Sequence, residues 1–202
     1  MLKDLKNSPH RNHLEKYLKK HLPKLSGSIL DIGSKNRRYD FLMKQRPVAI
    51  DLIANKDADV EKGDVCNLSF EDSSFENVVC LEVLEYVHDP KKAINEIYRV
   101  LKNEGTLILS TPFMYKFHGD RLRYTENFLK ESLSDFKSVE IFSVGNAYTV
   151  LLNILFGKIK HIKFSLFRYI ALALYLPLTF FNSNKIYKGG GYNSGYFIIA
   201  KK

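Results

Sequence analysis

The sequence predicts an α/β protein in which helices cover both faces of a mostly parallel β-sheet. Short apolar, β-branched runs typical of buried strands alternate with helical patterns along most of the 202 residues. The chain is 45% hydrophobic and 26% charged, which is typical of a globular protein with a sizeable core. Because consecutive parallel strands need helical crossovers, the alternation favours a parallel sheet. We expect one domain over residues 1–202.

The amino-terminal part predicts a charged helix followed by short strands. Residues 10–22 place Leu14, Tyr17, Leu18 and Leu22 on one helical face. We assign residues 1–26 to this helical segment and residues 27–144 to the core of the domain. The first elements expected in the core are a strand at 28–33, a helix at 39–45, and strands at 47–51 and 58–60.

The middle of the chain carries the clearest signals. Residues 75–81 form an apolar, β-branched run that predicts a strand. Asp89 and Pro90 then supply an N-cap and a proline at the first helical position, which predicts a helix over 89–103. The remaining expected elements are a strand at 106–110, a helix at 125–134, a strand at 138–144 and, within the final segment 191–202, a strand at 195–200.

An apolar insertion, residues 145–190, precedes the last strand. Its apolar runs at 147–156 and 166–181 predict helices outside the sheet. The second run is shorter than the roughly 20 residues that span a bilayer. Eight of the 31 Lys and Arg residues follow Glu140, and no Asp or Glu does. This combination favours peripheral contact with an anionic membrane, although the helices could instead cover the sheet or form a dimer interface.

The overall charge bounds the class of partner and the compartment. The net charge of +9 and pI of about 9.4 raise the possibility of a nucleic-acid partner. The cationic excess lies in the apolar carboxyl-terminal part, which argues against a nucleic-acid partner. The two cysteines, Cys66 and Cys80, exclude a disulfide scaffold, and we expect no metal site. The charged start of the chain lacks a secretory signal, so we expect a cytoplasmic protein, with membrane association possible.

Acidic residues and glycine stand where the first strands are expected to end. Asp31 and Gly33 close the first strand, Asp51 closes the second, and Asp64 and Val65 follow the third. Parallel sheets bind ligands beyond the carboxyl ends of their strands. A glycine lets the backbone approach a ligand, and an acid there can accept both hydroxyls of a ribose. The sequence therefore predicts a nucleoside-binding site at this edge.

These residues lie in motifs that resemble the class I S-adenosylmethionine-dependent methyltransferases, of the methyltransferase type 11 kind. The matching motifs are ILDIGS, VAIDL and GDVCNLSFEDSSFENVVCLEVLEYVHDPKKAINEIYRVLKNEGTLILSTP, with the later fragments FHGDRLRYT and SGYFIIAKK. The resemblance implies a Rossmann-like, seven-stranded sheet with one antiparallel strand and S-adenosylmethionine across the strand ends. The cofactor-binding residues that it implies are Asp31, Gly33, Ser34, Asp51, Leu52, Asp64, Val65, Leu81 and Glu82.

The turn after the first strand departs from the family pattern, which usually continues with further glycines. Here Gly33 is followed by Ser34-Lys35-Asn36-Arg37-Arg38. We expect Asn36 to take a left-handed conformation in place of a glycine, with the cations pointing outward. The departure leaves open an alternative function, a catalytically degenerate binding protein of the same fold.

The best candidate for acid–base chemistry is His118, just beyond the fifth strand. We expect it to serve as a base for an oxygen acceptor. Arg123 and Tyr124 are candidate substrate-binding residues for a carboxylate or phosphate; otherwise they anchor the next helix. We interpret His10 as solvated or interfacial. The expected activity is O-methylation of a small, glycan or lipid-linked acceptor, and a nucleic-acid methyltransferase is a weaker alternative.

Overall fold

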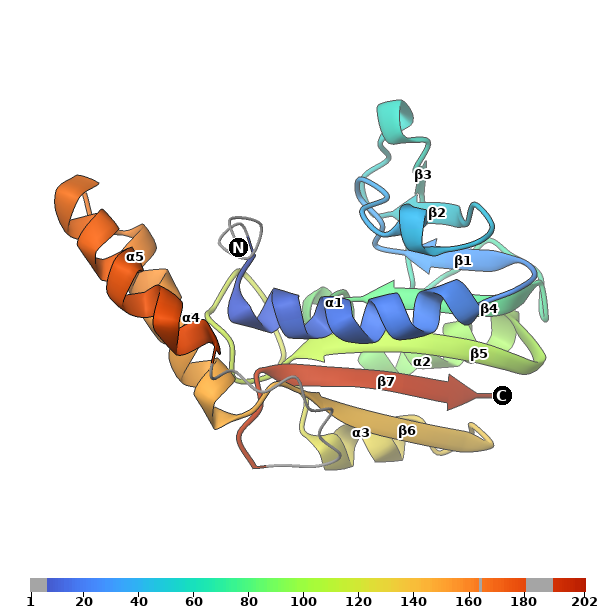
Figure 1. Cartoon of the computed structure of the whole chain (residues 1–202). Helices are drawn as coiled ribbons and strands as arrows, with labels where there is room; N and C mark the ends of the chain where they lie inside the picture. The colour runs from blue at the N-terminus through green and yellow to red at the C-terminus, as the bar shows by residue number, and fades with distance from the viewer. Residues whose placement is uncertain (1–6, 164, 181–190) are drawn as a thin grey trace.

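The computed structural model describes residues 7–163, 165–180 and 191–202. A single sheet of seven strands, in the order β3-β2-β1-β4-β5-β7-β6, forms its centre (Figure 1). The strands are β1 (Ile29–Ile32), β2 (Val48–Asp51), β3 (Glu61–Lys62), β4 (Phe75–Leu81), β5 (Leu101–Pro112), β6 (Ser138–Val144) and β7 (Gly195–Lys201). Strand β7 is antiparallel to both β5 and β6, and the pairs formed by the first five strands are parallel. The predicted seven-stranded, mostly parallel sheet is confirmed.

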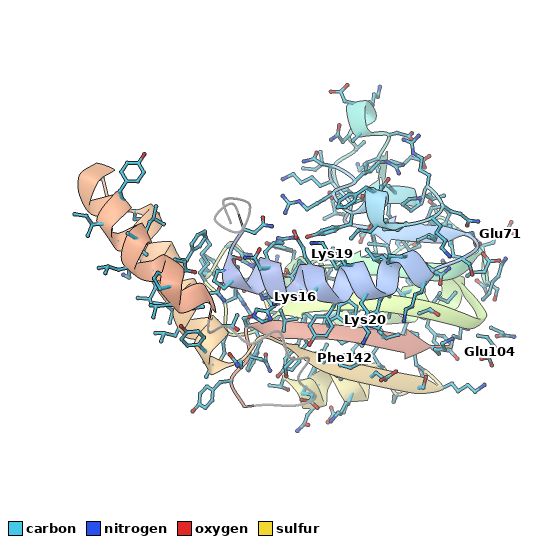
Figure 2. All side chains as sticks on the ribbon, in the orientation of Figure 1. Lys16, Lys19, Lys20, Glu71, Glu104 and Phe142 are labelled. Atoms are coloured by element: carbon cyan, nitrogen blue, oxygen red, sulfur yellow. The ribbon has the colours of Figure 1, made fainter. Side chains whose placement is uncertain are left out.

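Helices cover both faces of this sheet. Helix α1 (Pro9–His21) lies on one face, and α2 (Pro90–Val100) and α3 (Glu126–Ser132) lie on the other (Figure 1). The apolar face of α1 is buried as its periodicity predicted. Its exposed Lys16, Lys19 and Lys20 lie along the helix in Figure 2.

Alternation along the central strands divides the core into two layers. In β4, Val78 and Cys80 pack with α2 and α3, whereas Val79 between them packs with α1. Strand β5 repeats the pattern, with Leu107 and Leu109 on the first side and Ile108 on the second. A strand with both faces covered reads as a continuous apolar run, which is why 75–81 was predicted correctly.

Three sequence-based boundaries differ from the structure. The helix expected at 39–45 is only a 3₁₀ turn, Asp40–Leu42, since the hydrogen-bonded turn that begins at Ser34 occupies the preceding residues. The third strand forms at Glu61–Lys62 rather than 58–60, where Asn55 closes a turn through Val60. Helix α2 ends at Val100, and β5 begins immediately at Leu101 because that residue pairs with β4.

The insertion before β7 forms a helical arm made of α4 (Ala147–Lys160) and α5 (Ser165–Phe180). Asn146 starts α4 with a capping box that includes Thr149. The two helices pack together and project from the edge at which β4 and β5 end (Figure 1). The predicted helical insertion outside the sheet is confirmed for the described residues; 181–190 lie outside them. Within the described part of the chain, no helix is long and apolar enough to cross a membrane.

Candidate active site

Two adjoining cavities lie at the carboxyl ends of the parallel strands. The larger cavity, about 760 Å³, is lined by the ends of β1 and β2 and by the segment after β3. The smaller cavity, about 380 Å³, lies between the turn after β1, helix α1 and the loop after β5. Both are lined by Gly33, Glu82 and Tyr86, so the two cavities lie side by side at the predicted edge.

The turn after β1 requires glycine at its first position. Gly33 has a φ of 73°, and a Cβ built there would overlap the Val83 side chain. The backbone N–H groups of Gly33 and Ser34 both donate to the Ile50 carbonyl, at 2.8 and 3.2 Å. These bonds hold the turn against β2, where its backbone borders both cavities.

The residues after Gly33 follow a left-handed path without further glycines. Lys35 and Arg37 take φ values of 47° and 50°, and the prediction that Asn36 would do so is wrong. Arg37 points out of the site, since its guanidinium donates to the Pro47 and Asp59 carbonyls. Lys35 lines both cavities and Arg38 lines the smaller one, so the expectation that the cations point outward is wrong for these two residues.

The acids predicted to bind a nucleoside face the larger cavity. Asp51 and Asp64 each cap the backbone two residues ahead, accepting from Ile53 N at 3.2 Å and Cys66 N at 2.8 Å. These contacts leave further carboxylate lone pairs available to a ligand. The other predicted residues of this cavity are the exposed Leu52 and the buried Val65.

Buried acids line the smaller cavity. Burial raises the pKa of Asp31 to about 7. Glu85 is fully buried, and neither carboxylate oxygen has a hydrogen-bond partner among the described residues. Burial, followed by the charge of Glu82, raises the pKa of Glu85 to about 8. At neutral pH this carboxyl therefore keeps its proton.

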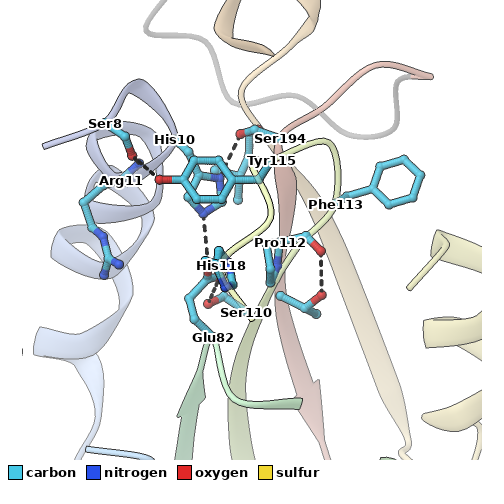
Figure 3. A network of polar contacts seen from close by, with 12 residues as sticks. Ser8, His10, Arg11, Glu82, Ser110, Pro112, Phe113, Tyr115, His118 and Ser194 are labelled. Carbon is cyan, nitrogen blue, oxygen red and sulfur yellow. Dashed lines mark hydrogen bonds and ion pairs between the residues drawn. The ribbon is translucent and has the colours of Figure 1, made fainter. Parts of the chain in front are cut away.

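A polar network ties helix α1 to the end of β4 (Figure 3). Glu82, with a φ of 58°, contacts His10 Nε2 through Oε2 at 3.2 Å and accepts from Ser110 Oγ at 2.9 Å. His10 Nδ1 lies 2.9 Å from Ser194 Oγ. Burial would raise the pKa of Glu82, but His10, Ser110 and Arg11 together hold it below its ordinary value.

The burial of His10 corrects the expectation of a solvated or interfacial residue, because its side chain is 1% exposed. Its place one helical turn before Leu14, on the apolar face of α1, was the available signal.

His118 lies where its predicted role requires, on the wall of the smaller cavity. Its Nδ1 is 2.6 Å from the Tyr86 hydroxyl, and its backbone N–H donates to Asp120 Oδ1 at 3.1 Å. A hydrogen bond from Arg123 lowers the pKa of Asp120 to about 2. The loop thus holds the imidazole beside the cavity through an ionised carboxylate and a phenol.

Arg123 and Tyr124 are engaged within the protein. Arg123 bonds to Asp120 and donates to the carbonyls of Phe113 and Lys116, at 2.8 and 3.2 Å. The Tyr124 hydroxyl donates to the Leu84 carbonyl at 2.6 Å. Neither residue lines the two cavities. These contacts favour the alternative interpretation, in which the pair anchors the loop and helix α3.

A cavity beyond the carboxyl ends of the parallel strands, in a seven-stranded sheet with antiparallel β7, is where α/β folds bind their ligands. Residues 30–109 match the family model for a methyltransferase domain. This match and the fold together support a class I S-adenosylmethionine-dependent methyltransferase.

Curated relatives and solved structures are consistent with this family. The uncharacterized protein MJ0638 of Methanocaldococcus jannaschii is 38% identical over 80 residues, which cover 40% of this chain and 29% of that protein. The chain thus spans less than a third of this relative. A Thermotoga maritima methyltransferase described as a possible histamine N-methyltransferase has a TM-score of 0.64 at 16% identity, covering 96% of this chain and 91% of that one.

A second solved structure carries the cofactor. Phosphoethanolamine N-methyltransferase 2 of Haemonchus contortus, in complex with S-adenosyl-L-methionine, has a TM-score of 0.59 at 21% identity. The similarity covers 95% of this chain and 52% of that one. At such identities the likeness shows the fold.

Proposed function

We propose that the larger cavity binds S-adenosylmethionine and that the smaller cavity holds an acceptor for methyl transfer. The observation that carries this proposal is that the two cavities adjoin at Gly33, Glu82 and Tyr86. Methyl transfer needs the acceptor atom in line with the donor, and two cavities meeting at one wall can hold both partners in that arrangement. The bound cofactor would supply an electrophilic methyl group.

The residues of the larger cavity fit this cofactor. Asp51 ends β2 with carboxylate lone pairs available for a ribose, and Asp64 can accept from an adenine amino group beside the apolar Val65. Leu81 and Glu82, at the end of β4, lie on the side of the site toward the acceptor. The left-handed path through Lys35 and Arg37 supports binding without the usual glycines.

We assign to His118 the removal of a proton from an oxygen acceptor. Its imidazole lines the acceptor cavity, and Tyr86 and Asp120 fix its position. The buried Glu85 behind the same wall keeps its proton at neutral pH, so it adds no negative charge that would oppose deprotonation of the acceptor beside His118. An acceptor with an ionisable hydroxyl suits this base.

Calorimetric titration with S-adenosylmethionine tests the cofactor assignment. Asp51→Ala removes an acceptor whose charge-assisted hydrogen bonds are each worth about 1.5–3 kcal/mol, so we expect about tenfold weaker binding or worse. Asp57→Ala, at an exposed acid outside both cavities, is the matched control. An unchanged dissociation constant for Asp51→Ala would reject the assignment, and no binding by the unaltered protein would favour the degenerate alternative.

Turnover tests the role of His118. Loss of a general base typically costs about 10²–10⁴-fold in rate. We expect His118→Ala to lose turnover by this amount while its dissociation constant for S-adenosylmethionine stays within twofold. Full activity of the variant on its acceptor would make His118 a loop residue with no part in the chemistry.

We further propose that the helical arm contacts anionic membranes and presents a lipid-linked acceptor. The arm exposes Ile154, Tyr169, Ile170 and Leu174 by 49–71%, and Lys158 and Lys163 are exposed near its turn. Apolar insertion and cationic attraction act together on such a surface. An arm that served only as a cover for the sheet would bury these side chains.

Flotation with phosphatidylglycerol-containing vesicles tests the membrane contact. We expect binding that weakens but persists at high salt, because salt screens only the electrostatic part. The double variant Ile170→Glu/Leu174→Glu should lose it. Phe41→Glu, at a residue 76% exposed outside the arm, is the control. Protein that stays unbound at low salt would overturn the proposal.

A further inference from the structure

A third cavity adjoins the site between helix α1 and the arm. It has a volume of about 250 Å³ and is lined by basic residues from separate elements: Arg11 in α1, Arg38 after β1, Lys116 after β5, and His161 after α4. No Asp or Glu is among its lining residues. We call this cavity the basic pocket.

The cations of the basic pocket differ in their acidic neighbours, because Arg11 interacts with the charge of Glu82 whereas Arg38 and Lys116 stand apart from acids. Within the described part of the chain, neither Arg38 nor Lys116 forms an ion pair. Arg37, the neighbour of Arg38, instead pairs with Asp40 at 2.9 Å and Asp59 at 3.3 Å. Cations that converge without counter-charges repel one another, so an anion bound among them would relieve the repulsion.

Two further groups supply hydrogen-bond donors to this pocket. Asn153 accepts from the His10 N–H at 3.1 Å through Oδ1, while its buried Nδ2 has no acceptor among the described residues. Arg11 donates one N–H to the Tyr39 hydroxyl at 2.9 Å, and its guanidinium carries further donors. An oxyanion in the pocket would satisfy donors that the protein itself leaves open.

The basic pocket adjoins the smaller cavity. Arg11, Arg38, Tyr115 and Lys116 line both. On its other side lie Phe156 and Gly157 of α4, at the base of the arm. Figure 3 shows Arg11 and Tyr115 side by side above the end of β4, with the Tyr115 hydroxyl held by Ser8. A group in the pocket is therefore flanked by the acceptor cavity and the arm.

We infer that the basic pocket binds a phosphoryl group of the acceptor, which lies between the atom to be methylated and the part of the acceptor that reaches the arm. This inference rests on the proposed methyl transfer and names its substrate class, a phosphorylated molecule. Guanidinium and ammonium donors match phosphate oxygens in charge and geometry. The acceptor's phosphoryl group can belong to a lipid headgroup or to a soluble phosphate ester.

Binding of inorganic phosphate and octyl phosphate, measured by calorimetry at constant ionic strength, tests the inference. We expect saturable binding of both probes to the full-length protein. Arg38→Gln and Lys116→Gln should each weaken it at least fivefold. Lys19→Gln, which removes a charge from the exposed face of α1, should leave it within twofold. Octyl phosphate binding at least fivefold tighter than inorganic phosphate assigns a lipid source, and equal binding assigns a soluble ester.

The same variants separate this inference from the proposed function. Asp51→Ala should lose affinity for S-adenosylmethionine and keep phosphate binding. The double variant Arg38→Gln/Lys116→Gln should lose phosphate binding and keep its affinity for S-adenosylmethionine. Circular dichroism confirms that each variant is folded; both altered side chains are exposed. Absence of saturable phosphate binding overturns the inference. So does equal weakening by Lys19→Gln, which would indicate general charge attraction.

Discussion

The sheet and the helical arm use apolar residues in opposite ways. In the sheet, Val79 and Ile108 are at most 1% exposed and lie between two helical layers. In the arm, a small cluster of Leu152, Phe156, Ile159 and Tyr175 holds α4 to α5, while Leu174 is 71% exposed. Apolar area removed from water stabilises the fold, and apolar area left in water is available to a partner. The sheet therefore supports the site, and the arm offers a surface.

Truncating one large side chain in each region should show the contrast most strongly. Phe197 of β7 is fully buried and stacks on Tyr17 of α1, with 4.9 Å between the ring centroids. Phe197→Ala should lower the free energy of unfolding by about 3–5 kcal/mol, since it leaves a cavity. Leu174→Ala should change it by less than about 0.5 kcal/mol. Urea denaturation measures both, and similar losses would contradict the comparison.

The buried Glu85 should make the stability of the sheet depend on pH. Because burial raises its folded-state pKa from 4.5 to about 8, stability should be lost as pH rises across that window. Glu85→Gln cannot ionise. We expect the variant and the unaltered protein to have similar free energies of unfolding near pH 5. At pH 8 the free energy of unfolding of the variant should be higher by at least about 1.4 kcal/mol, which corresponds to a pKa shift of one unit. Equal pH profiles in urea denaturation would show that Glu85 is ionised in the folded protein.

Weakening the arm's own cluster should act locally. Tyr175 is 4% exposed and lies 6.0 Å from Phe156, measured between ring centroids. Tyr175→Ala should raise hydrogen exchange in α4 and α5 by an amount equivalent to about 1–3 kcal/mol, with little change in β4 and β5. A uniform increase across the sheet would mean that the arm and the sheet unfold as one unit.

The smallest expected effect concerns the turn after β1. Lys35 takes a left-handed conformation that glycine adopts without strain, so Lys35→Gly should stabilise the protein by about 0.5–1 kcal/mol. Lys44→Gly is the control. Lys44 is exposed and its φ is not positive, so this change should be slightly destabilising. A loss of stability in Lys35→Gly would show that its side-chain contacts outweigh the backbone strain.

The sequence determined the strands and the edge at which ligands bind. Residues 75–81 were predicted to the residue because a strand buried on both faces has a continuous apolar pattern. Asp31, Gly33 and Asp51 were placed correctly at the cavities because they immediately follow or close such strands. Asp89 and Pro90 likewise fixed the start of α2 through local backbone chemistry.

Tertiary structure alone decided which side chains from distant segments meet. His10 reaches Glu82 because α1 lies on one face of the sheet with its amino-terminal end beside the end of β4, and no local pattern records a contact over 72 residues. The left-handed Lys35 and Arg37 depend on bonds from the turn to Ile50 and from Arg37 to Asp59. The basic pocket combines residues of four separate segments. Local sequence sets backbone preference and burial pattern, whereas convergence of distant charges follows from packing of the folded chain.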